Sequence, residues 1–186
     1  MNKVLQTIMG RRSIRKYKED QISDSDLKTI LEAAINAPSA RNQQKWHFTV
    51  IQNREKLNSL SVKTKENIKN SDNEFLKGRV NDPAFSIFHG APTVVMISGE
   101  DNTGFVEVDC GLAAENICLA ASSLNIGSCV VASSEMLFEC DEKEKIKQEL
   151  GIPAGYSHIV SVTLGYQNYE TPAAKPRSWD VINYIK

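Results

Sequence analysis

The sequence predicts one α+β domain that spans residues 1–186. Two helical patterns precede the first strand-like run, and later strands are mixed with helices, an order that differs from the regular alternation of α/β proteins. A chain of 186 residues, 41% of them hydrophobic, is long enough to bury one substantial core, whereas two full domains would be cramped. The chain contains no internal repeat.

The first predicted elements are two helices and a strand. Apolar residues recur with a helical period over residues 3–9, and Gly10 can end that helix. Ser23-x-x-Asp26 resembles a capping box, and a clean apolar stripe follows it over residues 27–35. Aromatic and β-branched residues then fill positions 46–51, which predicts a strand.

The middle of the chain combines a helix, a polar stretch and a buried strand. Residues 54–69 have a moderately amphipathic helical pattern. The Asn- and Lys-rich stretch 65–84 is predicted to be a mobile loop with some helix, acting as a lid or an insertion. The continuous apolar run 91–98 is typical of a strand that is covered on both faces.

The later elements include a second strong helix. Over residues 105–124 apolar residues occupy most of the helix circumference, so this helix is expected in the centre of the domain or in a subunit interface. Residues 128–132 and 159–164 are predicted strands, and a short charged helix with Asp141 as its cap lies between them and ends at Gly151. The tail from residue 171 ends in apolar residues that need a surface, which a partner subunit could supply.

Charge and targeting features exclude several protein classes. A formal net charge of −1 and a pI near 6.3 argue against general binding of nucleic acid or of a membrane surface. The N-terminus lacks the apolar core of a signal peptide, and no stretch approaches the roughly 20 apolar residues that span a bilayer. We therefore expect a cytoplasmic protein.

The cysteines and histidines give no metal signature. No Cys-x-x-Cys spacing occurs, and no histidine lies at a ligand interval from a cysteine, so reduced and mostly buried thiols are expected. The cysteines are Cys110, Cys118, Cys129 and Cys140. Because His47, His89 and His158 lie in or beside apolar runs, none of them is predicted to be catalytic.

A cluster of positive charge near the N-terminus is the main functional signal. Arg11, Arg12, Arg15 and Lys16 fall within six positions, with Ser13 between them, and suit a compact anion such as one phosphate group. The alternative is that these side chains are solvated or pair with the acidic residues 19–20. A second cationic pair at positions 175 and 177 favours the anion site.

The chain lacks the usual catalytic and nucleotide-binding motifs. It has no Gly-x-Gly-x-x-Gly, no Gly-x-x-x-x-Gly-Lys-[Ser/Thr] and no Gly-x-Ser-x-Gly, and its carboxylates form no obvious pair. Phosphate anchors without a nucleophile, base or metal indicate a cofactor that brings its own reactivity.

Six stretches in order resemble the FMN-dependent nitroreductase family, and the similarity covers nearly the whole chain. They are RRSIRKY at 11–17, AAINAPSARNQQKWHF at 33–48, GAP at 90–92, DCGLAAEN at 109–116, IGSC at 126–129 and KPR at 175–177. The resemblance implies an α+β fold with a central mixed, mainly antiparallel sheet flanked by helices. It also implies a homodimer with a domain-swapped C-terminal tail and two FMN sites at the subunit interface.

The family pattern also implies which residues bind the flavin. Those expected at the phosphate and ribityl chain are Arg11, Arg12, Ser13, Arg15, Lys175 and Arg177. Those expected from the partner subunit, along the isoalloxazine ring, are Pro38, Ser39, Ala40 and Asn42. Backbone N–H groups near the ring are expected within Val130, Val131, Ala132 and Ser133. Many members have an aromatic residue and a glycine or acidic residue in this last strand, so its small aliphatic residues change the expected pocket shape.

The function implied by this resemblance is ping-pong oxidoreduction. NAD(P)H would reduce tightly bound FMN, and a nitroaromatic, quinone or similar conjugated small molecule would then accept the electrons. Two alternatives remain open at this point. One is a flavin-binding or flavin-sequestering protein with little turnover, and the other is a family relative with different flavin chemistry, such as reductive dehalogenation or flavin breakdown.

Overall fold

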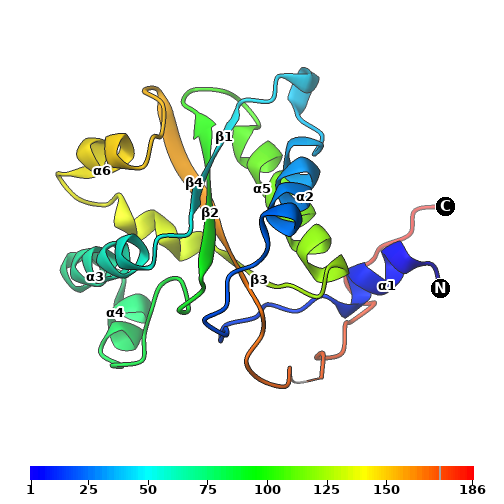
Figure 1. The fold of residues 1–186 in the computed structure, drawn as a ribbon. Coiled ribbons are helices and arrows are strands. Elements are labelled where there is room, and N and C mark those ends of the chain that lie inside the picture. Colours follow the sequence, from blue (N-terminus) through cyan, green and yellow to red (C-terminus); the bar gives the residue numbers. More distant parts are fainter. Residues whose placement is uncertain (172) are drawn as a thin grey trace.

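A four-stranded antiparallel sheet with helices on both faces forms the centre of the computed structural model, which describes residues 1–171 and 173–186 (Figure 1). Its order is β1-β2-β4-β3, and every neighbouring pair of these strands is antiparallel. The strands are β1 (Trp46–Ile51), β2 (Thr93–Glu100), β3 (Gly127–Val131) and β4 (Tyr156–Gly165). An isolated bridge between Ser13 and Ser128 adds a parallel contact. The predicted α+β class is confirmed.

Two hydrophobic clusters lie on opposite faces of this sheet. On one face Val95 and Ile97 of β2 pack with α2 (Asp24–Ile35) and α5 (Val106–Ser123). On the other face Val94 and Met96 pack with residues of α3 (Arg54–Asn70) and α6 (Lys143–Glu149). Because successive residues of a strand point to opposite faces, β2 is apolar throughout. The prediction that this strand is covered on both faces is confirmed.

The starts of two helices test the N-terminal caps predicted from the sequence. The Ser23 hydroxyl accepts a hydrogen bond from Asp26 N at 3.1 Å, so Ser23 is the predicted N-cap, and the Asp26 carboxylate accepts from the Ser23 hydroxyl at 2.8 Å. The prediction that Asp141 caps the short charged helix is wrong. That helix begins after Glu142, and no side chain caps it.

The prediction of a loop over residues 65–84 is wrong for most of that stretch. The helix α3 continues to Asn70, and α4 (Glu74–Val80) follows it. Ile68, Leu76 and Val80 are buried together against Met136. The predicted helix over 54–69 is confirmed as α3, whereas the few apolar residues of α4 are widely spaced among polar ones, so the pattern that folds α4 onto the protein is weak in the sequence.

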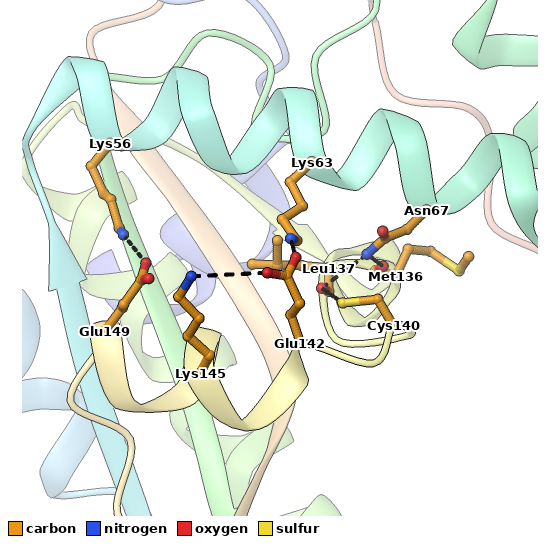
Figure 2. A network of polar contacts seen from close by, with 9 residues as sticks. All are labelled: Lys56, Lys63, Asn67, Met136, Leu137, Cys140, Glu142, Lys145 and Glu149. Carbon is orange, nitrogen blue, oxygen red and sulfur yellow. Dashed lines mark hydrogen bonds and ion pairs between the residues drawn. The ribbon is translucent and has the colours of Figure 1, made fainter.

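Polar contacts fix α3 to the segments that follow β3 (Figure 2). The Asn67 side chain donates to the carbonyl oxygens of Met136 and Leu137 at 2.9 and 3.0 Å. These two residues end the 3₁₀ helix η2 (Ala132–Leu137). Lys56 pairs with Glu149 of α6 at 2.7 Å, and Lys63 pairs with Glu142. These contacts hold the C-terminal end of η2. The predicted flavin-binding residues Ala132 and Ser133 lie at the start of the same short helix.

Apolar side chains remain exposed along one side of the molecule. The helix α1 (Lys3–Gly10) buries none of its residues, and Val108 and Leu112 on the outer face of α5 are 59% and 42% exposed. The tail after β4 runs along the side of the molecule that carries α1 (Figure 1). This tail also exposes five large apolar side chains, those of Trp179, Val181, Ile182, Tyr184 and Ile185. Patches of this kind mark interaction surfaces.

Within residues 1–171 and 173–186, none of the helices combines the length and apolar character needed to cross a bilayer. The same residues contain no group of three or more histidine, cysteine or acidic side chains that could hold a metal ion.

Close packing at Gly165 leads to a stability prediction. A Cβ atom at this position would lie 2.7 Å from Pro92 Cδ and 3.0 Å from Tyr17 Cδ1. Gly165→Ala is expected to lower the free energy of unfolding by about 1–3 kcal/mol, because the rigid proline ring cannot yield without a backbone shift. Urea denaturation measures the change.

Gly78→Ala is the matched control for this substitution. A Cβ at Gly78, within α4, meets nothing within 4 Å, so alanine there should raise the free energy of unfolding by about 0.5–1 kcal/mol. A Gly165→Ala protein as stable as the wild type would show that this junction is not tightly packed.

Candidate functional site

The basic cluster forms an extended segment beside β3. Ile14 N donates to Ser128 O at 2.8 Å, and Ser13 bridges Ser128 in parallel. Ile14 and Tyr17 are buried, and the Tyr17 hydroxyl donates to Ile14 O at 2.6 Å. These two anchors leave the intervening Arg15 exposed. The apolar residues of the segment therefore anchor it, and the basic residues Arg15 and Lys16 stay accessible.

The cationic side chains of the cluster differ in how far they are already engaged. Arg11 Nε is ion-paired with Glu115 Oε1 of α5 at 3.3 Å, but this buried N–H makes no hydrogen bond in the described part of the chain. Arg12 Nη1 donates to the carbonyl oxygens of Met9 and Arg11, at 2.8 and 2.7 Å. The alternative was that these cations pair with the acidic residues 19–20. For Glu19 the structure shows a different partner, because its carboxylate pairs with Arg54 at 2.8 Å.

Three predicted phosphate-site residues lie close enough to Cys129 of β3 to affect its thiol. Burial raises the pKa of the Cys129 thiol, and the charge of Arg15, the polar side chain of Ser13 and the charge of Arg11 oppose that rise. Together with the bridge between Ser13 and Ser128, this locates the basic cluster beside the first half of β3, directly before Val130.

The strand end and η2 present the predicted ring-facing residues. Val130 is 42% exposed, Val131 is buried, Ala132 is exposed and Ser133 is half-buried. Ser134, at the back of this turn, donates to Val131 O at 2.6 Å and lies 2.8 Å from His158 Nε2.

His158 supports this turn from β4, a role that the sequence did not reveal. Ser134 donates its only proton to Val131, so His158 Nε2 carries the proton of the shared hydrogen bond. His158 Nδ1 is buried and has no partner among the described residues. Burial lowers the pKa of His158 to about 4, which keeps the ring neutral at physiological pH.

The depressed pKa predicts a pH-dependent stability. In the unfolded chain His158 binds a proton near pH 6.5, whereas in the fold it does so only near 4, so its contribution is complete above pH 6.5 and is lost as the pH falls toward 4. The loss should approach roughly 3 kcal/mol. Urea denaturation at several pH values measures it, with His158→Gln as the control that cannot titrate. Equal losses in both proteins would contradict the assignment.

The segment of residues 38–42 is held at the N-terminal end of α5. Ala40 N donates to both carboxylate oxygens of the buried Asp109, at 3.0 and 3.1 Å, in the first turn of that helix. Ser39 Oγ accepts from Gln44 N at 3.0 Å, and Asn42 has a φ of 53°. In the sequence Asp109 appeared only as the first residue of the family-like stretch 109–116.

Within one chain the 38–42 segment and the basic cluster lie apart. Asp109 and Glu115, which contact the 38–42 segment and Arg11 respectively, are six residues apart, or about 9 Å along the axis of α5. Pro38 and Asn42 are exposed, as are Lys175 and Arg177 in the tail. Within the described residues no hydrogen bond or ion pair links the 38–42 segment or these tail cations to the basic cluster.

The model of the Nitroreductase family matches residues 8–166 of this chain. The chain belongs to the nitroreductase family. A solved nitroreductase with bound FMN from Bacteroides fragilis has a TM-score of 0.93 and 34% identity, with 100% of both chains covered. A second one with bound FMN, from Desulfitobacterium hafniense, has a TM-score of 0.92 and 31% identity over 100% of both chains.

A sequence relative from Archaeoglobus fulgidus is 37% identical over 173 residues, which are 91% of this chain and 88% of the relative. Its provisional name is NADH dehydrogenase/NAD(P)H nitroreductase. The predicted family and the predicted nitroreductase-like fold are therefore confirmed, whereas the flavin-contacting role of each residue named above stays a prediction.

Proposed function

We propose that this nitroreductase-family chain is an FMN-dependent NAD(P)H oxidoreductase that reduces nitroaromatics, quinones or similar conjugated acceptors by a ping-pong mechanism. The observation that carries the proposal is the basic cluster fixed beside β3, where Ser13 bridges Ser128 and the buried Arg11 Nε lacks a hydrogen bond among the described residues. The FMN-bound relatives and the nicotinamide in the name of the Archaeoglobus protein support the choice of cofactor and reductant.

The donors present fit the phosphate end of FMN. Arg11 Nε is a buried donor without a hydrogen bond, and Arg15 is an exposed cation next to it in the cluster. Guanidinium groups and a serine hydroxyl are suited to the oxygens of a phosphate monoester. Lys175 and Arg177 would complete this end, and Arg12 would hold the local backbone through its carbonyl contacts.

The turn from β3 into η2 would form the ring end of the site. FMN bound there would supply the hydride chemistry between NAD(P)H and the acceptor. Backbone N–H groups of Val131 to Ser133 would stabilise negative charge at the ring, and the Ser134–His158 hydrogen bond would hold them in place. The small side chains of Val130 and Ala132 leave the face of the ring accessible to a flat acceptor.

We further propose that the active form is a homodimer. The exposed apolar residues of α1, of the outer face of α5 and of the tail would form the interface. The 38–42 segment of one subunit would then line the ring bound by the other, which accounts for its separation from the basic cluster within one chain.

Steady-state kinetics test this function. Under anaerobic conditions the FMN-loaded protein is expected to oxidise NADH or NADPH continuously only with an added nitroaromatic or quinone, and double-reciprocal plots at several acceptor concentrations should be parallel. Intersecting plots would contradict the ping-pong mechanism. A flavin-loaded protein that turns over none of the acceptors would favour the flavin-sequestering alternative instead.

A further inference from the structure

Arg41 is the one residue of the 38–42 segment for which the family pattern predicts no role. Its side chain is exposed and forms no ion pair within the described residues. Lys45 is the other charged residue of the stretch 39–45, and Glu100 neutralises it at 2.8 Å. This stretch therefore presents one uncompensated positive charge.

The backbone around Arg41 is held in a conformation that side chains disfavour. Arg41, Asn42 and Gln44 have φ values of 54°, 53° and 53°, in the left-handed region that favours glycine. Two contacts to Ser39 enforce this turn, because its Oγ accepts from Gln44 N at 3.0 Å and its carbonyl oxygen accepts from Asn42 N at 2.9 Å. Strained turns that are fixed in this way occur preferentially at ligand-binding sites.

An exposed aromatic residue is tied to the same point of α5 as this turn. The Asp109 carboxylate accepts from Ala40 N at 3.0 and 3.1 Å, and Asp109 N donates to Phe105 O at 3.0 Å. Phe105 is 74% exposed and has a φ of 70°. Asp109 thus connects a cation-bearing turn with an exposed aromatic ring at the start of the helix.

Three carboxylates near this end of α5 are engaged or point elsewhere. Both oxygens of Asp109 accept from a backbone N–H, and Glu100 binds Lys45 at 2.8 Å and the Thr103 hydroxyl at 2.9 Å. Glu107 lies two positions before Asp109, about 200° away around the helix, and so points to a different side. Arg41 is therefore left to contact an anionic ligand.

We propose that Arg41 makes the protein selective for conjugated acceptors that carry an anionic group, such as a carboxylate or a sulfonate, and that Phe105 offers a flat apolar surface beside it. The inference rests on the proposed function, in which the 38–42 segment of one subunit lines the flavin ring bound by the other. Arg41 would then accompany this segment to the acceptor. Its planar guanidinium suits a bidentate contact with a carboxylate.

The test compares Arg41→Gln with Arg54→Gln in the full, FMN-loaded chain. Arg54 is also exposed but pairs with Glu19 at the start of α3, so it controls for the loss of one arginine elsewhere. The value of kcat/KM is measured under anaerobic conditions for 3-nitrobenzoate and for 3-nitrobenzamide, its neutral isostere. KM for NADH and NADPH is measured in the same proteins, and circular dichroism establishes that both variants fold.

Arg41→Gln is expected to lower kcat/KM for 3-nitrobenzoate by about 10- to 100-fold, as the loss of one charge-assisted hydrogen bond requires, and to change the value for 3-nitrobenzamide by less than about twofold. Arg54→Gln should change neither. If Arg41→Gln affects the two acceptors equally, or affects neither, the proposal is overturned. A higher KM for NADPH with an unchanged ratio between the acceptors also overturns it, because the charge would then serve the reductant.

A titration without turnover separates this inference from the proposed function. Benzoate and benzamide, which the flavin cannot reduce, are added to the oxidised FMN-loaded protein, and their Kd values follow from the change in flavin absorption. If the wild-type protein reduces neither nitro compound, the proposed function fails, but a Kd for benzoate that rises about 10-fold or more in Arg41→Gln, with that for benzamide unchanged, still supports the anion contact. Absent benzoate binding or an unchanged Kd overturns the inference, and a wild-type protein that binds no FMN overturns both.

Discussion

Arg11→Ala is expected to weaken FMN binding by about 10- to 100-fold while the fold is retained. Arg11 Nε is buried beside α5 and lacks a hydrogen bond, so a phosphate oxygen would satisfy it. Losing a hydrogen bond to a charged group costs about 1.5–3 kcal/mol, which corresponds to this range of affinity. Fluorescence titration of the flavin-free protein with FMN measures the change.

Glu115→Gln provides a control with the opposite expectation. Glu115 Oε1 lies 3.3 Å from Arg11 Nε and competes with a phosphate for the same donor. Both side chains are partly exposed, so breaking their pair should change stability by no more than about 1 kcal/mol. Glu115→Gln should therefore bind FMN as tightly as the wild type or more tightly. Equal weakening in both variants would show that the ion pair, and not a phosphate contact, is what matters.

Deletion of residues 173–186 is expected to give a monomer that binds FMN roughly 100-fold more weakly or worse. The deleted segment contains the cations Lys175 and Arg177 and exposes Trp179, Val181 and Ile185 over most of their surfaces. Two charge-assisted contacts would be lost together with the apolar contacts of the tail. Analytical ultracentrifugation and FMN titration of the shortened protein measure both effects.

The double variant Lys175→Ala, Arg177→Ala separates the two roles of the tail. It keeps every apolar residue of the segment and should remain dimeric while it loses FMN affinity. A shortened chain that sediments as a dimer and binds FMN like the wild-type protein would contradict both the interface and the role of the tail cations.

Local signals in the sequence predicted the elements that depend on them. The helical stripe behind Ser23 and the apolar run of β2 are complete within their own segments, and the structure has both. The helix α4 was not located because the residues that bury it are sparse, and their partner Met136 lies more than 50 positions further along the chain.

The same limit applies to the site. The basic cluster was found as a local excess of charge, but the contacts that position it join residues far apart in sequence. Asp109 holds Ala40, and His158 of β4 holds Ser134 behind β3.

Anaerobic reduction of the purified protein tests the central claim most directly. The protein should carry the visible absorption of FMN in a ratio of one flavin per chain, and one equivalent of NADH or NADPH should bleach it, with colour returning when a nitroaromatic or quinone is added. A protein that stays colourless with added FMN, or a bound flavin that neither nicotinamide reduces, would contradict the account.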